Sequence, residues 1–519
     1  MKRILFLLIF LLSFSLCCCS LLSGLLGTSS NEKVIETDVP VNTKGEVYLV
    51  KLNMSQKIIK GENTGYVSGV SSRAAADCPE YSHTDAFVRD LNRQVNDFLI
   101  NQASSRAAEF TIGNDYKILN DKKGDENYFY VLGADEKFQK VRCVCKYVTE
   151  HCIIYADEAN SNLFGIENYI DDSAYKYIGD SFEKCYEKEI NIIGSPIYKS
   201  YLSDYCVPCT SKITFIVSDL FRDGKQKENS GTVGYNYSGD FFKKELMQNS
   251  NEREVIYLDA AFLAEDPNYI YTTSIHEFNH LINFVIKTVN IMTENKTLPN
   301  RTQTCDTWFT EMLSMTTEDM FQSYLGIEEK YSPKARLPYF GMAYYCGFKN
   351  WENKNVDQLI SYANTYAFGA FLARNFGGID LIKEIAQNDY VNEQAITKAL
   401  QKVNPNYKDL YTGKIVELDI DYAVRRFSAC VVFTEEGDDY TLNKGTAFTK
   451  EGLGFDKLDI STKIDYEGTV YNVPLTFKKE AKLDIYPTGF TVHYVGYNIS
   501  GFKLAASNNE YLEYYLVTK

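Results

Sequence analysis

The sequence predicts an α+β fold in which a mainly helical region lies between two β-rich regions. Apolar and polar residues alternate in short strand-like runs before about residue 157 and again over the last 80 or so residues. Between about residues 166 and 430 the apolar residues recur at helical spacing, with few strand-like runs. The 519 residues, at roughly 100 to 200 per domain, suffice for three or four domains.

Composition and charge limit the classes of protein that this chain can represent. It is 45% hydrophobic and 24% charged, which is typical of a soluble globular protein. Its 54 basic side chains against 69 acidic ones give a net charge of −15. A chain of this charge lacks a basic surface for phosphate groups, so nucleic acid is not an expected partner.

The N-terminus reads as an export signal. Lys2 and Arg3 precede an apolar run from 4 to 16, about 13 residues, which is too short to cross roughly 30 Å of hydrocarbon. The run ends in Cys17, Cys18 and Cys19, and Leu16 before Cys19 resembles the lipobox of bacterial lipoproteins. We expect a signal peptide over 1–19 and lipidation of Cys19, with Cys17, Cys18 or cleavage without lipid as alternatives. The protein is then exported and anchored by lipid to the bacterial cell envelope or surface, or released from it.

Residues 20–135 are expected to form a tether followed by a β-rich region. Residues 20–30 have no regular period, 45–52 and 128–132 alternate like strands, and 83–100 has helical periodicity. The sequence SSRAA occurs at 71–75 and again at 104–108. The two copies mark processing sites after Arg73 or Arg106, in which case this region is a propeptide, or they are coincidental.

Residues 136–435 are expected to form the catalytic domain and residues 436–519 a C-terminal β domain. Strands are predicted over 140–148, 152–156, 212–217 and 255–258, and a helix over 422–430 closes the first of these domains. Strands are predicted over 483–486, 490–495 and 511–517 in the second. Packing and binding of a substrate or surface are both open as roles for the C-terminal domain.

Ten cysteines follow the predicted signal peptide. An even number in an exported chain favours disulfides. The pair Cys206 and Cys209 forms a CxxC motif that has no second copy, so a structural disulfide is expected there rather than a redox pair or a metal knuckle.

The motif with the strongest chemical meaning is His276-Glu277-Phe278-Asn279-His280, an HExxH sequence. With only 5 histidines in the chain, chance supplies about 0.003 such matches. Hydroxyls of Thr272, Thr273 and Ser274 can cap the start of an apolar helix here. Residues four apart share one helix face, so His276 and His280 can bind one cation. Glu277, about 100° around the axis, can reach a water beside that cation.

A catalytic zinc needs a third protein ligand if its fourth position is to hold water. The other histidines lie in other predicted regions, so a carboxylate is the natural candidate. Glu311 lies on a predicted helix that begins at Asp306, among apolar neighbours that indicate burial. Acidic pairs at 171–172 and 438–439 are either calcium ligands or solvated loops.

The segments HEFNHLINF, WFTEMLSM and YAFGAFL resemble the hyicolysin family of zinc metallopeptidases, which belongs with the thermolysin-like Glu-zincins. The resemblance covers roughly residues 140 to 430. It implies a thermolysin-like zincin region with one catalytic zinc ion, held by His276, His280 and Glu311, and Glu277 as the general base.

Two further residues are assigned from this resemblance and its departures. Met315 stands four residues after Glu311, where related enzymes carry an acid that orients a ligand histidine. Glu318 or Asp319 is expected to replace that acid, unless a backbone carbonyl does. Tyr366, in the sequence YAFG on a predicted helix over 357–376, is the expected stabiliser of the transition state, and Tyr362 is its rival.

The expected function is that of a zinc-dependent endopeptidase that acts on protein or peptide substrates as a monomer. Glu277 accepts a proton from the attacking water and passes it to the leaving amine. The alternative is a surface lipoprotein that binds host or matrix partners on a peptidase scaffold. An aminopeptidase is less favoured, because no GxMEN-like motif for a free amino group precedes His276.

Overall fold

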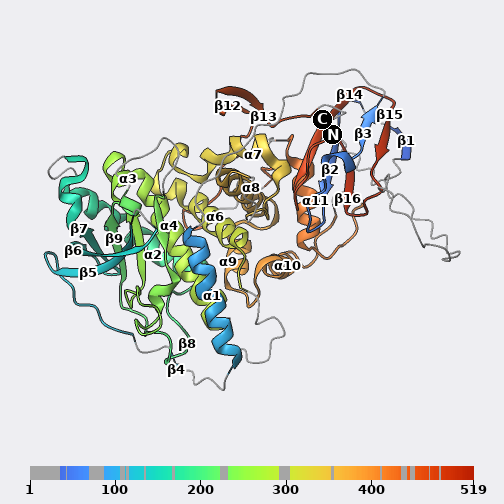
Figure 1. The fold of residues 1–519 in the computed structure, drawn as a ribbon. Coiled ribbons are helices and arrows are strands. Elements are labelled where there is room, and N and C mark those ends of the chain that lie inside the picture. The colour runs from blue at the N-terminus through green and yellow to red at the C-terminus, as the bar shows by residue number, and fades with distance from the viewer. Residues whose placement is uncertain are drawn as a thin grey trace, which may run out of the picture.

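A computed structural model describes residues 35–519 except 42–43, 69–86, 106–110, 113–115, 134–135, 166–169, 223–231, 292–303, 352–355, 410–411, 434–440, 445–449, 467 and 478–480. The predicted signal peptide, Cys19 with its neighbours, Arg73, Arg106 and the pair 438–439 lie outside the described residues. Helices and sheets are both present, which confirms the α+β class (Figure 1). Among the described residues no helix is long and apolar enough to cross a membrane.

A six-stranded sheet forms one part of the central region. Its order is β10-β11-β9-β7-β6-β5, formed by β5 (Glu126–Leu132), β6 (Phe138–Val148), β7 (Cys152–Asp157), β9 (Ile213–Ser218), β10 (Gly234–Asn236) and β11 (Val255–Asp259). The central strands β7, β9 and β11 are parallel and fully buried, as continuous apolar runs in a covered sheet should be. The short strand β10 pairs antiparallel with β11 and forms one edge.

Helices cover this sheet and make up the rest of the central region. The helices α2 (Asp172–Ile192) and α4 (Asn268–Asn283) contact each other, α4 contacts α6 (Thr307–Leu325), and α6 contacts α8 (Gln358–Phe376). The others in this region are α3 (Ala260–Glu265), α7 (Leu337–Ala343), α9 (Gly378–Gln387), α10 (Asn392–Val403) and α11 (Ile420–Cys430). Gly377, at φ 132°, ends α8 directly after Phe376, where the helix predicted over 357–376 also ends.

The two ends of the described chain form joint sheets. In one, β2 (Glu46–Asn53) lies between β14 (Phe490–Tyr497) and β16 (Leu512–Thr518). In the other, β15 (Gly501–Ala506) lies between β1 (Ile35–Pro40) and β3 (Tyr66–Ser68). The hairpin of β12 (Thr462–Tyr466) and β13 (Thr469–Val473) is separate. Figure 1 shows blue and red strands side by side at this end of the molecule.

This arrangement differs from the expected division at 135/136 and 435/436. The boundary at 135/136 falls between β5 and β6, which are hydrogen-bonded neighbours. The early strands β1 to β3 belong with the late strands β14 to β16. Alternation along one segment predicts that a strand forms but not which distant strand it pairs with, so these pairings could not be predicted from the sequence.

Between β3 and the central sheet the chain forms α1 (Phe87–Ser105), close to the helix expected over 83–100. After it, β4 (Thr111–Ile112) pairs with β8 (Ser200–Tyr201). Figure 1 shows α1 crossing the front of the helical region.

The expected Cys206–Cys209 disulfide is not present in the described structure, where both residues are buried thiols. Cys209 Sγ lies 3.4 Å from the Tyr198 backbone nitrogen, which donates to it, and 3.7 Å from the Pro196 carbonyl oxygen. The thiol therefore packs a loop through weak hydrogen bonds instead of a covalent link.

Candidate metal centre

Helix α4 holds the HExxH sequence with its apolar face turned inward. Ile275, Phe278, Leu281 and Ile282 are buried, and Phe278 packs edge to face on Phe182 of α2. The helix begins at Asn268, after Pro267, and not at the expected hydroxyl caps. Thr273 and Ser274 lie inside it and donate to carbonyls one turn back. Burial of the apolar face leaves His276 and His280 on the opposite, open side.

Helix α6 brings Glu311 to these histidines. Polar contacts between α4 and α6 set their register: Asn279 donates to the Thr317 hydroxyl at 3.0 Å and accepts from the Ser314 hydroxyl at 3.1 Å. These three polar side chains are buried, so their mutual hydrogen bonds leave little freedom for the helices to slide. Glu311 lies on the same side of α6 and faces the histidines.

The three side chains converge at distances that suit a metal ion. His276 Nε2 lies 2.9 Å from His280 Nε2 and 3.1 Å from Glu311 Oε2, and His280 Nε2 lies 3.6 Å from Glu311 Oε1. A tetrahedral zinc with bonds of about 2.0–2.2 Å separates its ligand atoms by roughly 3.2–3.6 Å. Within the described parts of the chain this is the one group of three or more such ligands found together.

The donor atoms also fit a cation chemically. Glu311 Oε2 is buried and, among the described residues, accepts no hydrogen bond. Burial by itself raises the pKa of Glu311, but His280 and His276 outweigh it and hold that pKa well below its usual range. A buried carboxylate that faces two imidazoles and has an oxygen free of hydrogen bonds among the described residues is a donor set for zinc.

Glu318 lies behind the ligand His276. Its Oε1 is 2.7 Å from His276 Nδ1, so a proton on Nδ1 can be donated to this carboxylate while Nε2 faces the cluster. Seven residues separate Glu318 from Glu311, which places both on one face of α6. The other candidate, Asp319, points elsewhere and accepts from Arg374 at 2.7 Å.

Glu277 lies beside the cluster and lines the same cavity. Its side chain is buried, and this burial raises its pKa, although the neighbouring histidines oppose the shift. A carboxylate with a raised pKa is a stronger base than an exposed glutamate.

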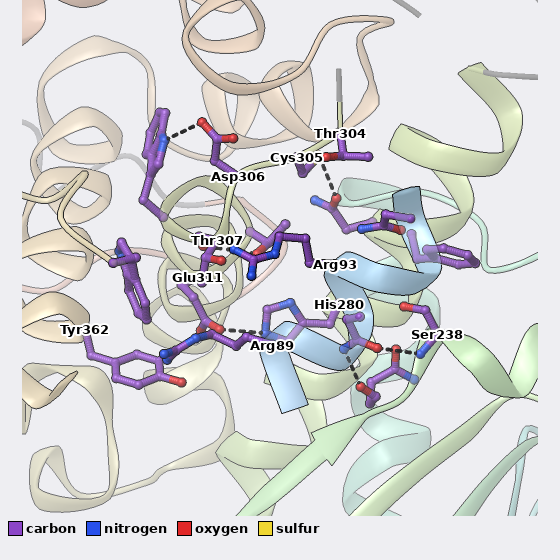
Figure 2. Close-up of a pocket in the computed structure, with 18 of the residues that line it drawn as sticks. Arg89, Arg93, Ser238, His280, Thr304, Cys305, Asp306, Thr307, Glu311 and Tyr362 are labelled. Atoms are coloured by element: carbon purple, nitrogen blue, oxygen red, sulfur yellow. Dashed lines mark hydrogen bonds and ion pairs between the residues drawn. The ribbon is translucent and has the colours of Figure 1, made fainter. Parts of the chain in front are cut away.

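The cluster opens into a cavity of about 850 Å³. Its walls come from α1, β10, α4, α6, the residues Lys349, Asn350 and Trp351, and the start of α8. Figure 2 shows Arg89 and Arg93 of α1 around this cavity together with His280, Glu311 and Tyr362. The cavity is large enough to admit several residues of a peptide.

The structure places Tyr362, and not Tyr366, at this cavity. Tyr366 is fully buried, and its hydroxyl makes no hydrogen bond within the described structure. Burial and the nearby Asp319 raise the pKa of Tyr366, and Arg374 opposes this shift. The assignment of Tyr366 as a catalytic residue therefore does not fit its position. Tyr362 has its pKa raised by burial and by Glu311. The two residues are one turn apart, so helical spacing could not separate them.

Sequence reasoning missed several residues that line the cavity. Asn92 and Arg89 of α1, the β10 residue Asn236 and Trp351 all lie there. One signal was available: the chain has only 2 tryptophans, and both Trp308 and Trp351 line the cavity. The acidic pair at 171–172 serves another purpose, because Asp171 caps α2 and Asp172 pairs with Lys123 and Lys146.

His276 and His280 stand four residues apart on α4, Glu311 faces them from α6, and Glu277 lies between the two histidines in the sequence. This arrangement is of the kind found in metallopeptidases. Residues 166–412 match the peptidase M30 family. The neutral metalloprotease ShpI of Staphylococcus hyicus is 26% identical over 251 residues, which are 47% of this chain and 52% of that protein. The chain thus spans about half of that relative's length. These findings confirm the resemblance to the hyicolysin family.

A solved structure of an aminopeptidase N family protein from Idiomarina loihiensis is also similar. It is 12% identical, covers 72% of this chain and 69% of its own, and has a TM-score of 0.27. A TM-score this low assigns neither a fold nor an activity.

Proposed function

We propose that this protein is a zinc-dependent endopeptidase. The observation that supports the proposal most directly is the convergence of His276, His280 and Glu311 beside Glu277 in one cavity. A scaffold that only binds partners has no need of a buried carboxylate base at a metal centre. The intact Glu277 therefore argues against the alternative of a binding lipoprotein.

His276, His280 and Glu311 are the residues that would hold the zinc ion. A zinc ion in this place supplies Lewis-acid chemistry, because it lowers the pKa of water and polarises a carbonyl oxygen. Glu318 keeps His276 in the tautomer that leaves Nε2 available. Glu277 takes a proton from the attacking water and delivers it to the nitrogen of the leaving amine, a transfer worth about 10²- to 10⁴-fold in rate.

Tyr362 is the residue we assign to the developing oxyanion. Its hydroxyl belongs to the cavity wall close to Glu311, as Figure 2 shows. Its raised pKa keeps the hydroxyl protonated at neutral pH, so that it can donate a hydrogen bond.

The edge strand β10 provides a place for the substrate backbone. Asn236 O and Ser238 N–H face the cavity side, where a helix side chain now engages both. An extended peptide carries the complementary N–H and C=O groups at every residue, so it can pair with such an edge. A substrate bound through its backbone needs no free amino group, which favours cleavage within a chain.

The test is cleavage of an internally quenched peptide whose amino terminus is acetylated. We expect the wild type to cleave it and to hold one zinc ion per chain. Glu277→Gln should hold the same zinc and lose at least about 10²-fold in kcat. Equal rates in the two proteins would exclude Glu277 as the base, and exclusive cleavage of the non-acetylated peptide would indicate an aminopeptidase.

We also propose that the mature protein is exported and anchored through a lipid on Cys19. The support is the charged, apolar and cysteine-bearing order of residues 1–19. Metabolic labelling with a fatty-acid analogue should mark the wild type and not Cys19→Ser. Label retained by Cys19→Ser and lost in Cys17→Ser or Cys18→Ser would move the anchor to that neighbour.

A further inference from the structure

Helix α1 occupies part of the cavity above the metal centre. Arg89, Asn92, Arg93 and Asn96 line this cavity from the side of α1. Figure 2 shows the helix passing over His280 with its arginines directed toward Glu311 and Tyr362.

Asn92 of α1 engages Asn236 at the end of the edge strand β10 and Ser238 two residues beyond it, as a peptide could. Its Nδ2 donates to Asn236 O at 2.8 Å, and its Oδ1 accepts from Ser238 N–H at 2.8 Å. A primary amide has the same donor and acceptor pair as one peptide unit. Two of the backbone groups that an incoming chain could use are therefore already taken.

Arg89 fills a second part of the cavity. Its guanidinium lies 5.0 Å from the centre of the Trp351 ring, within the range of a cation–π contact. Phe98 packs edge to face on Tyr205 and Phe242, and Val95 and Leu99 are buried. These contacts hold the helix along the cleft.

The contacts of α1 nevertheless leave some of its buried polar atoms without hydrogen bonds. Among the described residues, Arg89 Nη1 and Asn96 Oδ1 are buried and have no hydrogen-bond partner. Buried polar groups without partners weaken an association, so this contact costs less to break than a fully paired one. The strands β1 to β3 before α1 are held in the terminal sheets and do not depend on it.

From these contacts we propose that α1 is an autoinhibitory segment, which lowers the activity of the enzyme by taking the place of a peptide on β10 and on Trp351. The proposal rests on the peptidase function stated above. Displacement of α1 opens the cleft while the sheets that join the two chain ends stay intact. Helix α1 thus acts as an internal ligand of the cleft and takes no part in the catalytic reaction.

The first test exchanges single atoms on α1 in the full chain. Asn92→Asp keeps the size of the side chain but replaces the donor to Asn236 O with an acceptor. The matched control is the reverse change, Asp97→Asn, at an exposed position of α1 outside the cavity lining. Cleavage of the acetylated peptide and the emission of Trp308 and Trp351 are measured for all three proteins.

We expect Asn92→Asp to raise kcat/KM about tenfold and to change the tryptophan emission, because a lost hydrogen bond of this kind is worth about that factor. Asp97→Asn should match the wild type in both measurements. Unchanged emission and unchanged or lower kcat/KM in Asn92→Asp would overturn the proposal and make α1 a fixed wall of the site. A changed emission in Asn92→Asp, with zinc bound but no cleavage by this variant or the wild type, would support the contact of α1 with the cavity and contradict the peptidase function.

The second test adds α1 from outside. A synthetic peptide of residues 87–105 should inhibit the Asn92→Asp enzyme, and the same peptide carrying Asn92→Asp should inhibit it at least about tenfold less well. Equal inhibition by the two peptides, or none, would show that the Asn92 contacts do not hold α1 in the cleft.

Discussion

Tyr362 and Tyr366 stand one turn apart on α8, and their surroundings differ. Tyr362 borders the cavity next to Glu311, whereas Tyr366 is sealed in the core near Arg374. Only a group that reaches the reacting atoms can stabilise charge on them. Removing the hydroxyl at each position in turn therefore distinguishes a tyrosine that acts in catalysis from one that only packs in the core.

We expect Tyr362→Phe to lower kcat by about 10²-fold with little change in zinc content, since one oxyanion donor is worth about that much. Tyr366→Phe removes a buried hydroxyl that has no hydrogen-bond partner among the described residues, so it should leave kcat near the wild-type value. Steady-state kinetics on the acetylated peptide give both numbers. A larger loss in Tyr366→Phe than in Tyr362→Phe would return the role to Tyr366.

Glu318 acts through His276 and not on the substrate. Its carboxylate, 2.7 Å from Nδ1, makes the imidazole a better ligand and fixes its orientation. Glu318→Gln keeps the shape but weakens the acceptor, so the affinity for zinc should fall by about 10- to 100-fold. Competition with a chelating dye measures it. Glu187→Gln, on the exposed part of α2, serves as the control and should bind zinc like the wild type.

At the scale of elements, the approach of α8 to α6 positions Glu311. Gly369 of α8 faces Met312 and Thr316 of α6, where a Cβ would lie 2.8 Å from Met312 Cγ and would overlap the Thr316 hydroxyl oxygen. Met312 follows Glu311 directly, so any outward shift of α6 moves the third ligand. The glycine of the YAFG sequence thus has a packing role.

Gly369→Ala should lower the free energy of unfolding by about 1–3 kcal/mol through this overpacking and should weaken zinc binding. Urea unfolding and zinc competition measure the two effects. Thr316→Ala removes one of the clashing atoms, so the double variant should recover part of both losses. Losses that simply add in the double variant would contradict the close contact.

At the scale of the whole molecule, the central strand β2 ties the chain ends together and carries a buried lysine. Lys51 Nζ donates to Gly65 O at 2.7 Å, and burial lowers the pKa of Lys51 to about 7. Between about pH 7 and 10.5 the unfolded chain keeps this proton and the folded chain does not. The free energy of unfolding should therefore rise with pH in this window, and below it the full cost of the buried charge remains.

Relative to Lys51→Met, the wild type should gain up to about 1.4 kcal/mol in free energy of unfolding for each pH unit above 7. Urea unfolding at pH 7, 8 and 9 gives the difference between the two proteins. Lys57→Met, at an exposed position, should show no such dependence on pH. A constant difference between wild type and Lys51→Met would mean that Lys51 keeps its usual pKa.

The sequence by itself determined the local parts: the HExxH helix, the helix that begins near Asp306, the helix ended by Gly377 and most of the strands, because periodicity and end signals are local properties of a chain. It also brought Glu311 and Glu318 forward as candidates. Only the tertiary structure decided that Tyr362 faces the cavity, that β2 pairs with β14 and β16, and that α1 lies over β10. Each of these depends on contacts between residues far apart in the chain, which are formed by burial and shape after the elements meet. No local pattern encodes such contacts.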